Sequence, residues 1–364
     1  MPYSLSLVAS ATGLAAGLIF ACSDTSDPSD PSLVSREAAA AVPTLTPQQS
    51  GTTNRLQAVS PVNASVVWAS GVGGTFTVTT NGGRTWHAGV VPGGDSLQFR
   101  DVEGVSADVA YLLASGEGKA SRIYKTVDGG RHWTIQFRNT RPNGFYDCFA
   151  FWTPDRGVTM ADALFNRFPV IRTKDGETWN SIAGRLPPAQ DGEAAFAASG
   201  TCVATKGTAL AWIGTGGAKK ARILRTADGG DSWEAFDTPI VQGTSGSGIF
   251  TVEFRDAQHG ILAGGDLDKP DHTANVAVSS DGGRHWKLAT GTPFPGAAFG
   301  LSYAHGSRPT TVVATGPGGA AWSPDEGQSW HRLPATTNFW AVAFANPSAG
   351  WLVGTDGRIV KVSF

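Results

Sequence analysis

The sequence has few charges, few cysteines and no stretch with the apolar period of an amphipathic helix. Charged residues make up 16% of the 364 residues, and the formal net charge is -2 at pH 7. No run of lysine and arginine supplies the positive field that holds a phosphate backbone, so we do not expect nucleic acid as a partner. None of the three cysteines has the spacing of a zinc site. We therefore predict no metal and no cofactor.

Glycine and tryptophan, in contrast, are abundant, with 47 and 12 copies. This composition, without a helical period, is typical of short strands joined by turns. A chain of this length can form one closed β architecture. The sequence therefore predicts an all-β protein with one large domain.

Residues 1–22 have the character of an export signal. The stretch from Leu5 to Ala21 is apolar or small, is short for a membrane span, and ends at Cys22 before a Ser/Asp/Pro-rich stretch. It resembles a bacterial lipoprotein signal, which implies a lipid on Cys22 and a location in the bacterial cell envelope, anchored to a membrane on the periplasmic or outer side. An ordinary cleaved signal is the alternative. We interpret residues 23–50 as a flexible tether that includes a possible closing strand.

The other cysteines, Cys148 and Cys202, lie in apolar segments. An exported protein can form a disulfide between them. Cysteines in apolar strands are more often plain buried thiols, so the sequence favours two thiols here.

A short phrase recurs six times, as TTNGGRTW, TVDGGRHW, TKDGETW, TADGGDSW, SSDGGRHW and SPDEGQSW. Successive copies are 44 to 53 residues apart, which is the length of a propeller blade. The acidic or amide position and the final tryptophan of the copies are Asn81 and Trp86, Asp128 and Trp133, Asp175 and Trp179, Asp228 and Trp233, Asp281 and Trp286, and Asp325 and Trp330.

The residue types of this phrase predict a hairpin turn that supports itself. The Asp or Asn side chain can accept hydrogen bonds from backbone amides ahead of it, the glycines can adopt positive φ, and the tryptophan can cover the turn. The phrase resembles the Asp-box, or BNR repeat, of sialidases, sortilin-type receptors and the photosystem II assembly and stability factor family. The resemblance covers residues 50–364 and implies that these residues are structural.

The resemblance and the repeat spacing together predict a seven-bladed β-propeller over residues 51–364. Each blade is expected to be a four-stranded antiparallel sheet, and six blades carry an Asp-box hairpin. The expected blades span residues 54–90, 97–138, 144–183, 193–237, 247–290, 296–334 and 338–364. The last has room for only three strands, so we expect residues 42–50 to add the fourth and close the ring.

Ligand binding in such a ring is expected at the mouth of the axial funnel, on loops that join the second strand to the third and blade to blade. We interpret Arg100 and Arg255 as following inner strands, and so exclude them. The candidate ligand-binding residues are Asp147, Asp162, Arg167, Glu193, Lys220, Arg222, Asp266, Lys269 and Arg358. Their mixed charge suits a polar ligand, a carbohydrate or a protein loop.

The photosystem II assembly factor family implies a protein that holds a partner protein, so we predict a binding or scaffold role without catalysis. A sialidase-like glycoside hydrolase is the alternative. Its catalytic residues would be Asp147, Asp162 and Glu193, if two carboxyl groups lie ~5 to 9.5 Å apart. Tyr303 and Glu253 could imitate the sialidase nucleophile pair.

Overall fold

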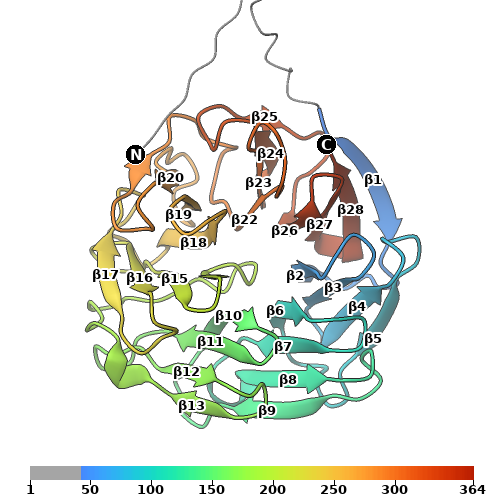
Figure 1. Cartoon of the computed structure of the whole chain (residues 1–364), viewed down its shortest axis with the longest axis horizontal. Coiled ribbons are helices and arrows are strands. Elements are labelled where there is room, and N and C mark those ends of the chain that lie inside the picture. The colour runs from blue at the N-terminus through green and yellow to red at the C-terminus, as the bar shows by residue number, and fades with distance from the viewer. Residues whose placement is uncertain (1–41) are drawn as a thin grey trace, which may run out of the picture. The chain divides into compact units, whose positions relative to one another are not determined.

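The chain forms seven four-stranded antiparallel sheets arranged in a ring (Figure 1). The computed structural model describes residues 42–364, so the predicted signal, Cys22 and the first part of the tether lie outside the described residues. In residues 42–364, no helix has the length and hydrophobicity to cross a membrane. The seven-bladed β-propeller predicted from the repeats is confirmed.

The blades follow one another along the chain, and the strands of blades 1 to 6 run from the axis outward in sequence order, whereas the outermost strand of blade 7 is β1. Blade 1 contains β2 (Leu56–Pro61), β3 (Val67–Gly71), β4 (Thr75–Thr79) and β5 (His87–Val90). Blade 2 contains β6 (Phe99–Gly104), β7 (Ala110–Ala114), β8 (Arg122–Thr126) and β9 (Thr134–Arg138). Blade 3 contains β10 (Tyr146–Thr153), β11 (Arg156–Ala161), β12 (Val170–Thr173) and β13 (Trp179–Ser181). Blade 4 contains β14 (Val203–Lys206), β15 (Leu210–Gly214), β16 (Arg222–Thr226) and β17 (Glu234–Asp237).

The remaining blades continue this pattern. Blade 5 contains β18 (Ser247–Phe254), β19 (Gly260–Asp266), β20 (Val276–Ser279) and β21 (Lys287–Leu288). Blade 6 contains β22 (Gly300–Tyr303), β23 (Val312–Gly316), β24 (Gly319–Ser323) and β25 (His331–Arg332). Blade 7 contains β26 (Phe339–Asn346), β27 (Ala349–Gly354), β28 (Arg358–Ser363) and β1 (Thr44–Gln49). Short 3₁₀ turns lie in loops at η2 (Gly118–Ala120), η3 (Ala183–Arg185) and η4 (Thr355–Gly357).

The second strands of the blades carry most of the core because neighbouring blades cover both of their faces. All five residues of β7 are buried. Its sequence, AYLLA, accordingly lacks the alternation of apolar and polar residues that is typical of a strand with one exposed face. In blade 4, Trp212 stacks on Phe254 of blade 5 with ring centroids 3.6 Å apart. Its indole N–H donates to the carbonyl of Gly282 at 2.8 Å. The large apolar side chains therefore lie between sheets and join each blade to the next.

The ring closes between the two ends of the described chain. Strand β1 pairs antiparallel with β28, from Thr44 opposite Ser363 to Gln49 opposite Arg358. The Gln48 side-chain oxygen then accepts hydrogen bonds from the indoles of Trp86 and Trp351, in blades 1 and 7. The expected closing strand within residues 42–50 is confirmed, and it removes a free sheet edge.

The six repeated turns all join the third strand of a blade to its fourth, so they lie on one face of the ring, which we call the turn face. In the second copy, Asp128 Oδ1 accepts the backbone N–H of His132 at 2.9 Å, and Thr126 Oγ1 accepts the N–H of Gly130 at 3.0 Å. Gly129 and Gly130 have φ of 73° and 85°. The hydrogen bonds that the Asp128 carboxylate accepts, led by the one from the His132 backbone, lower its pKa to about 2. Each turn satisfies its own backbone locally.

Candidate functional site

The opposite face, which we call the mouth face, is shaped by an irregular segment between blades 3 and 4. The sequence predicted that blade 4 begins near residue 193, but β14 begins at Val203. Residues 194–202, which we call the axial segment, instead bond to distant blades. Arg100 in blade 2 donates to the carbonyl of Ala197 at 3.2 Å, and Ser199 donates to the carbonyl of Phe299, next to blade 6, at 2.6 Å. A segment with such partners lies across the central channel.

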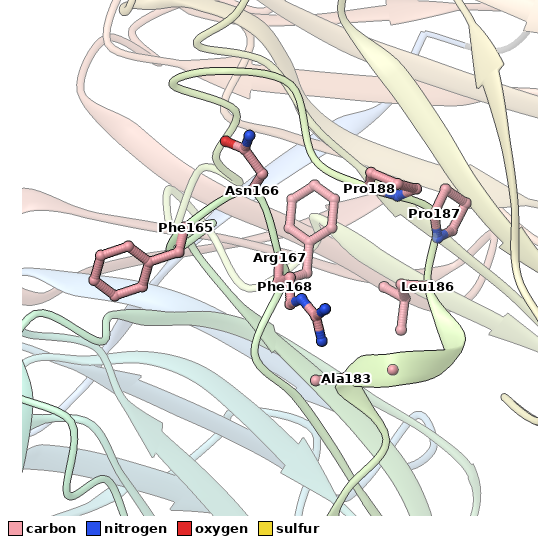
Figure 2. Close-up of a pocket in the computed structure, with 9 residues that line it drawn as sticks. Phe165, Asn166, Arg167, Phe168, Ala183, Leu186, Pro187 and Pro188 are labelled. Carbon is pink, nitrogen blue, oxygen red and sulfur yellow. The ribbon is translucent and has the colours of Figure 1, made fainter.

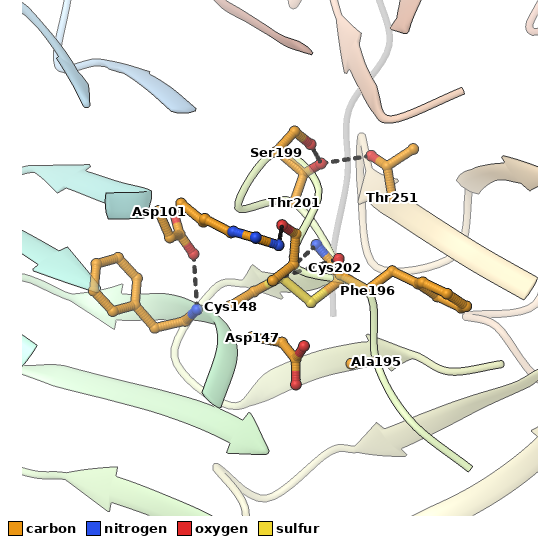
Figure 3. The surroundings of a disulfide bond; sticks show 12 residues. Asp101, Asp147, Cys148, Ala195, Phe196, Ser199, Thr201, Cys202 and Thr251 are labelled. Atoms are coloured by element: carbon orange, nitrogen blue, oxygen red, sulfur yellow. Dashed lines mark hydrogen bonds between the residues drawn. A yellow bond between two sulfur atoms is a disulfide. The ribbon is translucent and has the colours of Figure 1, made fainter. Parts of the chain in front are cut away.

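Small side chains explain how the axial segment fits there. Its sequence is AAFAASGTC. Gly200 has φ of 78°, and a Cβ atom at this position would lie 2.3 Å from Asp101 Oδ1. Thr201 Oγ1 lies 2.8 Å from Thr251 Oγ1 of blade 5, as Figure 3 shows. Any larger residue at position 200 would displace the segment from the inner strand of blade 2.

A disulfide fixes the end of the axial segment. Cys202 is bonded to Cys148 of β10, and both residues are fully buried (Figure 3). The expectation of two separate thiols is therefore wrong. The two cysteines are 54 residues apart in sequence. Only the path of the axial segment brings their Cα atoms to 5.9 Å.

A hollow of about 190 Å³ opens beside the axial segment and is lined mainly by aromatic side chains. Phe196 of the axial segment stacks on Phe250 with centroids 4.1 Å apart. Phe250 is followed by Phe299 at 5.6 Å, and Phe299 by Trp340 at 5.0 Å. We call this hollow the aromatic bowl, and its lining residues are Arg100, Phe196, Ala197, Ala198, Phe250, Leu267, Phe299 and Trp340.

Two arginines lie at the aromatic bowl. The guanidinium of Arg55 is 4.4 Å from the centroid of the Trp340 ring, and its Nε is buried without a hydrogen-bond partner. Burial lowers the pKa of Arg100, and the nearby charge of Arg55 lowers it further. Within residues 42–364, neither arginine forms an ion pair with a carboxylate. The site therefore presents two partly desolvated positive charges beside aromatic rings.

The exclusion of Arg100 from the mouth was wrong. Strand β6 begins at Phe99, so Arg100 lies at the start of an inner strand and at the mouth face. Arg255 differs, because it follows the last residue of β18 and bonds to Glu326 in the blade 6 turn at 2.7 Å. The same aromatic-Arg-Asp motif thus occurs at opposite ends of two inner strands.

Two of the predicted carboxyl groups, Asp147 and Asp162, lie close enough to influence each other's pKa. Asp147 is buried, and burial followed by the charge of Asp162 raises its pKa well above the usual value. Burial raises the pKa of Asp162 to about 6, although its carboxylate accepts the backbone N–H of Ala195 at 3.2 Å. Each of the two carboxyl groups therefore influences the pKa of the other. This pair supports the axial segment from blade 3.

The third predicted carboxylate, Glu193, has both of its oxygens occupied by hydrogen bonds. Its Oε1 accepts Arg222 Nε at 2.9 Å and the Thr215 hydroxyl at 2.7 Å. Its Oε2 accepts the backbone N–H of Gln190 at 2.8 Å and a second nitrogen of Arg222 at 2.5 Å. Glycoside hydrolysis needs two carboxyl groups ~5 to 9.5 Å apart with room for substrate. Glu193 is buried and both of its oxygens are occupied, so it does not offer a free carboxylate to a substrate.

The other candidates are dispersed around the mouth face. Arg167 and Lys269 are exposed, and the Lys220 backbone bonds to Gln190. Asp266 is buried and accepts the backbone N–H of Asp268 at 2.9 Å. Arg358 lies 4.6 Å from the Phe339 ring centroid. The structure therefore brings Glu193 together with Arg222, and Asp147 together with Asp162, rather than gathering all the predicted residues into one site.

The pair proposed as a sialidase-like nucleophile lies at the turn face. The Tyr303 hydroxyl donates to Glu326 at 3.1 Å. Glu253 instead accepts the backbone N–H of Tyr303 at 2.8 Å. Burial raises the pKa of Tyr303, which opposes its activation. The hydroxyl and the Glu253 carboxylate therefore do not form the expected bond.

No protein-family model and no curated protein matches this sequence. Among solved structures, YCF48 bound to D1 peptide is 16% identical with a TM-score of 0.60, covering 89% of this chain and 99% of that chain. YCF48 from Cyanidioschyzon merolae is 16% identical with a TM-score of 0.61, covering 88% and 98%. The WD40 β-propeller domain of Doa1 is 14% identical with a TM-score of 0.54, covering 88% and 97%. The chain shares the propeller fold of these proteins, and the predicted likeness in fold to photosystem II assembly factors is confirmed.

Proposed function

We propose that this protein binds an extended segment of a partner protein at the aromatic bowl and acts as a scaffold. The observation that carries the proposal is that aromatic rings lie beside two arginines, neither of which pairs with a carboxylate of residues 42–364. A ligand carboxylate would pair with Arg55 and Arg100, and an adjacent apolar side chain would contact Phe250, Phe299 or Trp340. The solved complex of YCF48 with a D1 peptide supports the proposal, because that propeller has the same fold and holds a peptide.

Peptides selected from a random display library against the full chain would test this function. We expect enrichment of peptides that place an acidic group beside an apolar residue. Arg100→Gln should weaken their binding about ten-fold, because a hydrogen bond to a charged group contributes roughly 1.5–3 kcal/mol. Binding would be measured by calorimetry, with the melting temperature as a check on folding.

Arg131→Gln is the matched control for this experiment. Arg131 is an exposed arginine of the turn face, so its loss should leave peptide affinity unchanged. Selection of no peptide, or equal affinities for Arg100→Gln and Arg131→Gln, would contradict the proposal.

We also propose that the chain is exported and tethered to the bacterial envelope by a lipid on Cys22. The support is the apolar stretch and cysteine of the N-terminal sequence. Mass spectrometry of the mature chain should find an acylated residue 22 at the N-terminus. An unmodified mature N-terminus at another residue would contradict the tether.

A further inference from the structure

The loop between β11 and β12 of blade 3 ends in a two-residue turn that presents a bare aromatic ring. Leu164 and Arg167 exchange backbone hydrogen bonds at 2.8 and 3.1 Å. The two residues between them, Phe165 and Asn166, have φ of 53° and 59°. The Phe165 residue is 96% exposed, and Figure 2 shows its ring directed away from its neighbours. We call this turn the Phe165 tip.

Neither the backbone conformation nor contacts with other side chains explain why residue 165 is a phenylalanine. Turns with two positive φ values favour glycine, asparagine and aspartate, and a bulky residue there is strained. A ring exposed to water gains nothing from the hydrophobic effect in the isolated protein. An unfavourable conformation that displays an apolar side chain suggests contact with another surface.

The surroundings of the Phe165 tip indicate the chemistry of that surface. Hollows of about 360 and 470 Å³ lie on its two sides. Arg167 lines the first and Arg141 the second, and neither hollow is lined by an acidic residue. The first is lined further by Phe168, Leu186, Pro187 and Pro188. Within residues 42–364, Arg141 and Arg167 form no ion pair. The tip thus combines an exposed apolar side chain with a positively charged side chain on either side.

We propose that the Phe165 tip docks on an anionic lipid bilayer, with the ring in the interfacial region and Arg141 and Arg167 at lipid phosphates. Aromatic rings favour the membrane interface, and basic side chains are attracted to anionic headgroups. A bilayer accepts a protruding ring without a matched cavity, whereas a protein partner would have to provide one. The observed projection and the lack of acidic residues in the lining of the two hollows therefore favour lipid. Docking would turn the mouth face toward the membrane.

Co-sedimentation with vesicles tests this proposal. All proteins are the full chain with Cys22→Ser, so that no acyl chain contributes and the N-terminal segment is the same in each. The vesicles are phosphatidylcholine, with or without phosphatidylglycerol. We expect Phe165→Asp to lower the partition coefficient roughly ten-fold or more. Arg141→Gln and Arg167→Gln should each lower it roughly five-fold, and only with phosphatidylglycerol present.

Two variants separate binding from folding. Phe165→Gly should reduce partitioning while keeping or raising the melting temperature, because glycine adopts positive φ freely. Val127→Asp is the matched control, since Val127 is 66% exposed in a turn of the opposite face. It should partition like the parent protein.

Three results would overturn the proposal. The first is equal partitioning of Phe165→Asp and its parent. The second is partitioning that does not depend on phosphatidylglycerol. The third is no vesicle binding by the parent together with weaker binding of selected peptides by Phe165→Asp, which would assign the tip to a protein partner. Arg100→Gln should bind vesicles normally, so failure of the bowl proposal would be distinguishable from failure here.

Discussion

The turn face and the mouth face of the ring are built from different kinds of contact. On the turn face, Asp128 bonds within its own turn, to residues no more than four positions away. On the mouth face, Ser199 bonds to Phe299, 100 residues away, and Arg100 to Ala197, 97 residues away. Local contacts can be repeated from blade to blade, whereas these long-range contacts occur once. The irregular face is therefore where a specific site can form.

Individual carboxyl groups on the two faces differ in the direction of their pKa shifts. In the turn, hydrogen bonds from the His132 backbone and side chain lower the pKa of Asp128. At the mouth, burial raises the pKa of Asp101, Asp147 and Asp162. Exposed carboxylates that accept several N–H groups stay charged, and buried ones favour the proton. Asp128 therefore stabilises its turn as a charged group, whereas burial favours the neutral form of Asp101, Asp147 and Asp162.

The largest expected effect concerns the disulfide at the mouth face. Replacing both cysteines, Cys148→Ser with Cys202→Ser, should lower the free energy of unfolding by about 4 kcal/mol, because a bond across 54 residues restricts the unfolded chain. The axial segment should also loosen, so peptide affinity at the aromatic bowl should fall. Urea denaturation and calorimetry measure the two quantities.

Asp128→Ala is the comparison for the turn face. It removes bonds within one turn, so we expect a loss of about 1 kcal/mol and no change in peptide affinity. If the double serine variant lost no more stability than Asp128→Ala, or kept full peptide affinity, the contrast between the faces would be wrong.

A smaller effect is expected from pH, with opposite signs on the two faces. Asp162 has a pKa of about 6 in the folded state, against about 4 in an unfolded chain. Its contribution to stability is complete below about pH 4 and is lost as pH rises through about 6, at a slope of up to roughly 1.4 kcal/mol per pH unit. Asp128 has a folded pKa of about 2, so its contribution is present above about pH 4 and is lost as pH falls through about 2.

Urea denaturation at a series of pH values checks both signs. Asp162→Asn should reduce the decline in the free energy of unfolding between about pH 4 and 6. Asp128→Asn should reduce the loss of stability in acid. If the free energy of unfolding of Asp162→Asn declines with pH as steeply as that of the parent, the decline comes from another buried acid. Glu103 is one such acid, because burial raises its pKa to about 7.

Parts of the mouth were predictable, and the reasons for the failures are specific. The repeats located the blades, and the sequence placed Asp147 and Asp162 among the candidate residues of the mouth. Arg100 was assigned to the wrong face because the sequence does not show whether Phe99 begins or ends strand β6. The bowl itself was missed, although Phe250, Phe299 and Trp340 lie at or near the starts of three successive inner strands. That recurrence is a signal that sequence reading could use.

The sequence by itself determined the ring: six copies of a turn that needs only its own residues specify hairpins at blade spacing, and hairpins with apolar strands pack as blades. Tertiary structure alone decided where the axial segment runs, that Cys148 meets Cys202, and which aromatic rings share one hollow. The physical reason is the separation in sequence between the residues that make contact. Turn geometry depends on neighbours a few residues away, whereas the mouth depends on contacts between residues about 50 to 100 positions apart, which no local pattern records.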